Sequence, residues 1–309
     1  MIPRPGFVAA CLAAAQLVSA CGTAGTDTGG ASAAGRTKIV VTFPPLGAVV
    51  REVVGDRVDV AVLMPNGADP HQWSPSAKDV ERILDADLVV DNGLGLEAHL
   101  QDTLDEARAN GIPSFTVSDH VTVRTVQPGE GAESDDPDQA PGADDPHLWM
   151  DPLTMREWIE PFAAEMAGLG VDVTNGADAV TGELDRLDAD VRVMVDQVPA
   201  DHRKLVTGHE SMGYFAARYG FHLIGAVVPA ITSQAEPSAG QLSALIHQIR
   251  GVGVPAVFAE LGTPTATIDA VGADAGVQVV ELSTHTMPGD GRYSTFILDI
   301  ATTVSRALA

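Results

Sequence analysis

A long amphipathic stretch near the middle of the chain constrains the fold most strongly. Apolar side chains recur there at intervals of three or four residues: Val180, Leu184, Leu187, Val191, Met194 and Val198. This spacing keeps them on one face of an α-helix and predicts a single long helix over residues 175–198. Because strand and helix patterns lie on both sides of it, we expect this helix to link two lobes. A helix packed on one lobe only would have the same spacing.

Short apolar segments alternate with helix-period segments on both sides of that stretch. Strands are predicted at 38–42, 58–63, 88–90, 115–117, 204–206, 222–228, 256–259 and 277–282. Helices are predicted between and after them, at 46–53, 76–84, 96–109, 153–169, 212–219, 238–250, 265–275 and 293–308. Such alternation is typical of parallel sheets covered by helices. The predicted fold class is α/β, with two α/β lobes (37–174 and 199–309) of central, mostly parallel sheets joined by one long linker helix.

The N-terminal residues carry the pattern of an exported, lipid-anchored protein. Residues 7–18 form an apolar run too short to cross a bilayer, which is typical of a signal peptide. Small residues then precede Cys21, as in a bacterial lipobox. We expect residues 1–20 to be removed and Cys21 to be acylated, with residues 21–36 as a flexible tether. The alternative is an ordinary signal peptide in which Cys21 has no special role.

The charge of the chain limits its partners. The formal net charge is −24, so a polyanion such as nucleic acid is repelled whereas cations are attracted. Most of these carboxylates simply keep the protein soluble. Residues 127–145 contain seven acidic side chains and no Lys or Arg, and they predict a solvated loop. A weaker interpretation makes this loop a cation-collecting fringe beside His147.

Four side chains with metal-binding chemistry lie in loops at or beyond predicted strand ends. They are His71, His147, His209 and Asp290. In open α/β sheets ligands bind at the carboxyl ends of strands. Three neutral imidazoles and one carboxylate suit Zn²⁺ better than Mg²⁺ or Ca²⁺. With two ligands from each half, a bound ion would hold the two lobes together.

Several segments form a distinctive set of motifs. The set comprises Gly67-Ala68-Asp69-Pro70-His71 with Pro75-Ser76 and Asp79, His147-Leu148-Trp149-Met150-Asp151-Pro152, Glu236-Pro237-Ser238, Phe258-Ala259-Glu260, and His209 with Tyr214-Phe215 and Tyr219-Gly220. In these motifs the chain resembles, from residue 38 to the C-terminus, the cluster A-I solute-binding proteins of ABC importers for zinc and manganese. In this family such motifs occur on two α/β lobes joined by one long helix.

The resemblance implies a ligand set and a role. His71 and His147 match the first two ligands, His209 matches a third that is His in zinc importers and often Glu in manganese importers, and Asp290 matches the fourth. Many zinc-binding members carry a His-rich acidic loop before the second ligand. Here the corresponding acidic loop, residues 127–145, contains no His. The implied protein is a monomeric, extracytoplasmic lipoprotein that delivers Zn²⁺ to an ABC permease and its ATPase subunit. It is not an enzyme, and its affinity should weaken as falling pH protonates the imidazoles.

Three other functions remain open on the sequence. The cargo could be Mn²⁺ or Fe²⁺, because the ligand set does not exclude either ion. The protein could be a surface adhesin in which the metal makes a binding face rigid. A zinc hydrolase is a third possibility, but Asp290 would fill the open coordination position that such an enzyme needs.

The other candidate groups have simpler interpretations. His285 is a reserve ligand, although a surface position is the preferred reading, and Glu210 is at most a weak ligand beside His209. We expect Trp73 and Trp149 to line the walls of the site. The remaining histidines are expected at the surface or behind the ligands: His99, His120, His202, His222 and His247.

Overall fold

The computed structural model describes residues 36–130 and 140–309. The predicted signal peptide, Cys21 and nearly all of the predicted tether lie outside these residues, as does the centre of the acidic loop. The described part of the chain contains no helix long and apolar enough to span a membrane.

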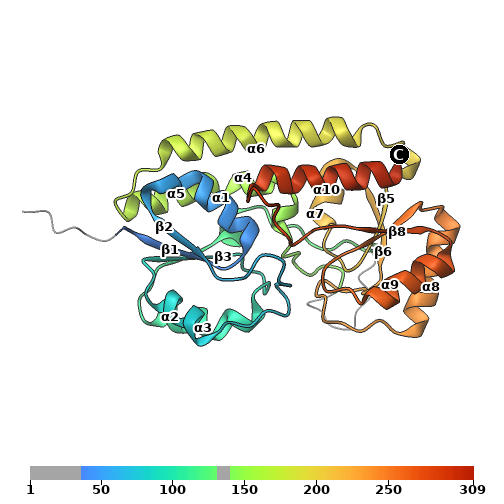
Figure 1. Ribbon diagram of the computed structural model, residues 1–309, viewed down its shortest axis with the longest axis horizontal. Coiled ribbons are helices and arrows are strands. Elements are labelled where there is room, and N and C mark those ends of the chain that lie inside the picture. The colour runs from blue at the N-terminus through green and yellow to red at the C-terminus, as the bar shows by residue number, and fades with distance from the viewer. Residues whose placement is uncertain (1–35, 131–139) are drawn as a thin grey trace, which may run out of the picture. The chain divides into compact units, whose positions relative to one another are not determined.

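The first lobe is built on a four-stranded parallel sheet (Figure 1). Its strands are β1 (Lys38–Val41), β2 (Asp59–Val62), β3 (Leu88–Asp91) and β4 (Ser114–Thr116), in the order β2-β1-β3-β4. Alternate residues point to opposite faces of a strand. Ile39 and Val41 therefore pack in the core that contains α1 (Pro44–Val54), whereas Val40 packs in the core that contains α2 (Ala77–Leu84) and α3 (Gln101–Ala109).

The second lobe contains two parallel strand pairs. β5 (Lys204–Thr207) pairs with β6 (His222–Ala226), β7 (Ala256–Ala259) pairs with β8 (Gln278–Glu281), and β5 contacts β7. The helices of this lobe are α7 (Gly213–Tyr219), α8 (Ala239–Val252), α9 (Thr265–Ala275) and α10 (Tyr293–Leu308). The short 3₁₀ segments given for the described residues are Gly55–Arg57, Ala98–Leu100, Val117–His120, Leu148–Met150 and Ala200–His202. The predicted α/β fold class is confirmed.

The long helix α6 (Thr174–Val195) packs along both lobes (Figure 1). It contacts α1, α4 (Pro152–Glu157) and α5 (Ile159–Gly168) of the first lobe and α10 of the second. Five of the six predicted stripe residues are buried, and the sixth, Met194, is partly buried against the same core. The helix ends three residues earlier than predicted, and Val198 is buried just beyond its end.

The single helix predicted over residues 153–169 is wrong. The chain forms α4 (Pro152–Glu157) and α5 (Ile159–Gly168), which meet at Trp158. Pro161 explains the break, because proline has no N–H and its ring collides with the carbonyl four residues earlier, here that of Glu157. Trp158 at the break is fully buried.

Capping boxes mark the start of two of the helices. Ser76 and Asp79 exchange side-chain-to-backbone hydrogen bonds at the start of α2, and Ser238 and Gln241 do so at the start of α8. These boxes fix where each helix begins. The first therefore sets the end of the loop that carries His71.

Gly176 on α6 should be intolerant of alanine. A Cβ atom at this position would lie 2.0 Å from the backbone oxygen of Val53, at the contact between α6 and α1. Relieving this overlap should cost about 1–3 kcal/mol, more than the roughly 0.5–1 kcal/mol that alanine gains over glycine in a helix. Gly176→Ala should therefore lower the free energy of unfolding, measured by urea denaturation of the metal-free protein.

Gly182→Ala is the matched control on the same helix. The new Cβ would meet only the flexible end of Arg186, at 3.4 Å, so helix propensity should dominate. We expect Gly182→Ala to be neutral or stabilising by up to about 1 kcal/mol. Equal effects of the two substitutions would contradict close packing of α6 on α1.

Candidate metal centre

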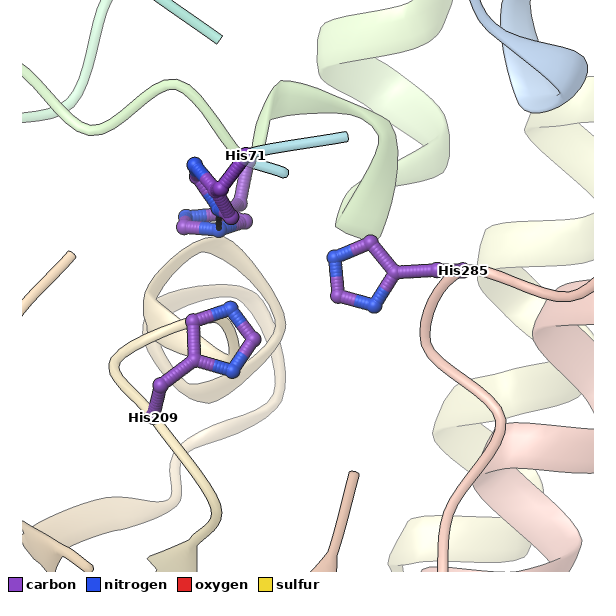
Figure 2. Close-up of side chains that lie close together, drawn as sticks. His71, His209 and His285 are labelled. Atoms are coloured by element: carbon purple, nitrogen blue, oxygen red, sulfur yellow. Dashed lines mark hydrogen bonds between the residues drawn. The ribbon is translucent and has the colours of Figure 1, made fainter. Parts of the chain in front are cut away.

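Four histidines from both lobes meet at one point. His71 follows β2 and His147 precedes the 3₁₀ turn Leu148–Met150, both before α6 in the chain; His209 follows β5 and His285 follows β8. Figure 2 shows the imidazoles of His71, His209 and His285 facing a common centre. One nitrogen from each of the four rings lies within 4.8 Å of the other three. The loops at the strand ends thus bring together residues up to 214 positions apart.

The spacing of these nitrogens suits a tetrahedral ion. Nε2 of His71 lies 3.3 Å from Nε2 of His147. An ion with metal–nitrogen bonds of about 2.0–2.1 Å holds tetrahedral neighbours roughly 3.3–3.4 Å apart. Nε2 atoms of His209 and His285 are buried without a hydrogen-bond partner. Such orphaned nitrogens are costly to bury unless a ligand satisfies them.

Burial lowers the pKa of three of the four imidazoles, those of His71, His147 and His285. His147 and His209 are 0% exposed, His285 is 1% exposed and His71 is 7% exposed. Burial, and then the neighbouring imidazoles, lowers the pKa of His71 and of His285 well below the usual value. Burial also lowers the pKa of His147, although Asp145 opposes the shift. A neutral imidazole offers a lone pair to a metal, so the lowered pKa values of these three rings favour coordination.

Two buried carboxylates lie behind two of the rings. Oδ1 of Asp145 lies 2.9 Å from Nδ1 of His147, so Nδ1–H donates to the carboxylate and Nε2 presents its lone pair to the cluster. Oε2 of Glu260 lies 3.3 Å from Nδ1 of His209 and accepts the backbone N–H of the same residue. The Ser211 hydroxyl donates to the other oxygen of Glu260. Asp145 therefore holds the ring of His147 by a hydrogen bond, whereas Glu260 fixes the backbone of His209 and lies beside its Nδ1, which has no hydrogen-bond partner.

Asp145 is itself fixed by a positive charge. Nη1 of Arg124 lies 2.9 Å from Oδ2 of Asp145, and Nη2 of the same guanidinium pairs with Glu130. The backbone N–H of Arg124 donates to the hydroxyl of Tyr214, at 2.9 Å. Through these contacts Glu130, at the described edge of the acidic loop, is connected to Asp145 and so to the ring of His147.

Trp149 forms a wall of the site, as predicted. Its ring is fully buried and packs edge-on against His285, with centroids 5.6 Å apart. Its Nε1–H donates to the carbonyl of Thr284, next to His285, at 3.0 Å. Its own carbonyl accepts the hydroxyl of Tyr293, at 2.7 Å. This tryptophan therefore ties the His147 and His285 segments together, whereas Trp73 is only partly buried in the apolar core.

Asp290, expected as the fourth ligand, does not join the cluster. Its side chain is exposed, and its two oxygens accept the backbone N–H of Arg292 at 3.0 Å and the hydroxyl of Thr295 at 2.7 Å. These bonds place Asp290 at the start of α10.

His285, expected at the surface, lies in the cluster instead because its loop leaves β8 toward the first lobe. The sequence did contain a signal for this position of His285, because the residue lies a few positions after a strand, as His209 does.

The other candidate residues lie outside the cluster. His99, His120, His222 and His247 are exposed, and His202 is half-buried with its Nδ1 3.0 Å from the carbonyl of Leu308. Glu210 is buried beside His209 but is not part of the four-residue group. Burial, and then nearby Asp145, raises the pKa of Glu210 well above the usual value.

The fold and the site together define a metal-binding protein of the solute-binding class, with the cluster at the junction of two α/β lobes. Residues 39–307 match the family described as "Zinc-uptake complex component A periplasmic", and the chain belongs to this family. Solute-binding proteins of ABC importers work with a membrane permease and an ATPase and are not enzymes. The resemblance inferred from the sequence is confirmed.

Relatives of the chain differ in the metals in their names. The manganese-binding lipoprotein MntA of Halalkalibacterium halodurans is 27% identical over 86% of this chain and 84% of its own. The zinc-binding protein TroA of Treponema pallidum is 30% identical over 78% of this chain and 75% of its own. An iron ABC transporter substrate-binding lipoprotein, MtsA of Streptococcus pyogenes, is 25% identical over 90% of each chain.

The solved structure of periplasmic TroA from Treponema pallidum has the same fold. It superposes with a TM-score of 0.77 and 27% identity over 89% of this chain and 100% of that one. Divalent-metal binding is therefore established for the family fold, whereas the metal of this chain is not fixed by its relatives.

His285→Ala should weaken zinc binding far more than Asp290→Ala. His285 places a nitrogen in the cluster, whereas the oxygens of Asp290 are engaged at the start of α10. Because loss of a mere supporting group costs about 10–100-fold in affinity, loss of a ligand should cost at least about 100-fold. The measurement is a titration against a competing chelator. A larger loss for Asp290→Ala than for His285→Ala would restore the ligand set expected from the sequence.

Zinc affinity should stay nearly constant down to about pH 6.5, the usual imidazole pKa, and fall at lower pH. The pKa values of His71, His147 and His285 are lowered, so protons compete with the metal only below that value. The measurement is the dissociation constant as a function of pH, corrected for the protonation of the competing chelator. A steep loss of affinity already between about pH 7.5 and 6.5 would contradict the lowered pKa values.

Proposed function

We propose that this protein captures Zn²⁺ outside the cytoplasm and delivers it to an ABC permease. The proposed ligands are the imidazoles of His71, His147, His209 and His285. The observation that carries the proposal is the convergence of four buried histidine nitrogens, with no carboxylate of the described residues in the group. Imidazole suits Zn²⁺, whereas Mn²⁺ is better served by carboxylate, carbonyl and water oxygens.

The geometry also supports a binding role over catalysis. A catalytic zinc keeps one coordination position open for water or substrate. Here a fourth imidazole, that of His285, takes this position and is itself fully buried. The ion is therefore cargo, held between the lobes until the permease receives it.

Capture would draw the two lobes together locally. One nitrogen from each of the four rings lies within 4.8 Å of the others, and a zinc tetrahedron has edges of roughly 3.4 Å. Binding would therefore need no more than a small contraction of the loops that carry the histidines. Because α6 packs against helices of both lobes, this contraction is carried by the loops at the strand ends more than by a wide hinge motion. The permease would recognise the contracted form.

The cellular location is part of the same proposal. The apolar run before Cys21 and the Gly-rich segment after it support export and attachment to the membrane through an acylated cysteine. The protein would act as a monomer on its tether. An acyl group on Cys21 of the mature protein is the observation that tests this attachment.

Metal content of cells tests the cargo. Affinity alone does not, because zinc binds more tightly than manganese or iron at almost any nitrogen site. Deletion of the gene should lower the zinc content of cells grown in zinc-limited medium and leave manganese and iron unchanged. The His147→Ala variant should fail to restore zinc, whereas Asp290→Ala should restore it.

The other results each reject the proposal in a different way. A fall in manganese or iron content would identify that metal as the cargo. Unchanged content of all three metals, with loss of attachment to host surfaces, would favour a metal-stabilised adhesin.

A further inference from the structure

The cluster is too buried for an ion to enter without movement. Three of its histidines are at most 1% exposed, and only His71, at 7%, retains appreciable contact with solvent. His71 also lines a pocket of about 260 Å³ between the lobes, which the other three rings do not line. The side of the cluster nearest to solvent is therefore the side of His71.

A segment of the second lobe forms one wall of this pocket. Ile231, Thr232 and Gln234 line it, opposite Leu94 and His99 of the first lobe. The side-chain amide of Gln234 donates to the backbone carbonyl of His71, and it lies 3.2 Å from Nε2 of His99. One side chain thus joins a cluster residue of the first lobe to the rim of the pocket.

Ser233 provides a second connection to the same loop. Its hydroxyl donates to Oδ2 of Asp69 at 2.6 Å and accepts the side-chain amide of Gln72 at 3.4 Å. Gly262 leaves room for this contact, because a Cβ atom there would lie 2.4 Å from Oδ2 of Asp69. Asp69 and Gln72 flank His71, so these bonds hold the loop of that ligand against the second lobe.

The opposite wall of the pocket contains a strained residue. Leu94 has a left-handed backbone conformation with φ of 56°, the only non-glycine residue of the described chain with positive φ. Leucine rarely adopts this conformation, and such strain is concentrated at binding and switching segments. Both walls of the pocket therefore have features expected of a passage that opens.

We propose that the metal enters and leaves through the His71 pocket, and that residues 231–234 are a gate held closed by the Ser233 and Gln234 hydrogen bonds. This inference rests on the proposed binding of zinc by the four histidines. The gate bonds do not involve the metal or its ligand nitrogens. Breaking them therefore favours the open form of the empty and the loaded protein alike, and it changes rates more than affinity.

The test compares release of zinc from the loaded, full-length mature protein after rapid mixing with excess chromogenic chelator. Each lost hydrogen bond should accelerate release roughly 3- to 10-fold. Ser233→Ala and Gln234→Ala should show this acceleration together with faster zinc binding. The dissociation constant should change by less than about threefold, because both rates rise.

Asn66→Ala is the matched control. Asn66 also makes two hydrogen bonds between residues before and after α6, with the backbone of Met287, but it lies on a different pocket. It should leave the release rate unchanged if the gate is local. Equal acceleration by Asn66→Ala and Gln234→Ala would mean that the lobes separate as a whole, and would overturn the gate, as would unchanged rates in all three variants.

A crosslink provides the opposite perturbation. In the double variant Asp69→Cys with Ser233→Cys, oxidation should join the gate to the His71 loop and slow release, and reduction should restore the rate. Release unaffected by oxidation, with the disulfide verified by mass, would overturn the gate. Absence of saturable zinc binding in the unmodified protein would instead reject the proposed function itself.

Discussion

Four buried imidazoles that face one another across two lobes are the constraint on which the rest of the structure depends. Unpaired nitrogens in a dry interior destabilise a fold, so the protein must hold them in place with other interactions. It does so with the carboxylates behind His147 and His209, with Trp149 between two ligand segments, and with α6 along both lobes. A bound ion would supply the partner that Nε2 of His209 and Nε2 of His285 lack.

Much of the fold follows from periodicity that is visible in the sequence. The stripe of α6 and the limits of α9 and α10 could be predicted because each depends on local spacing of apolar residues. The break between α4 and α5 was missed because apolar spacing continues across it. Pro161 carried the signal, but its effect lies one turn earlier, at Glu157.

The site was only partly predictable, for a different physical reason. His71, His147 and His209 stand in motifs that mark loops at strand ends. The last ligand position depends on which way the chain turns after β8, and residue type does not reveal this direction. Asp290 had suitable chemistry and context, but helix α10 uses it at its start, and His285 points inward. The supporting roles of Asp145 and Glu260 likewise required three-dimensional contacts.

The two supporting carboxylates have a consequence for what accompanies the cargo. One imidazole separates each of these carboxylates from the centre of the cluster, because Asp145 lies 2.9 Å from Nδ1 of His147 and Glu260 lies 3.3 Å from Nδ1 of His209. Arg124 pairs with both Asp145 and Glu130, so its positive charge is shared between them. A divalent cation bound at the centre is thus electrically compensated although all its donors are neutral. No anion has to travel with the metal, so the permease would receive a bare ion and not a salt.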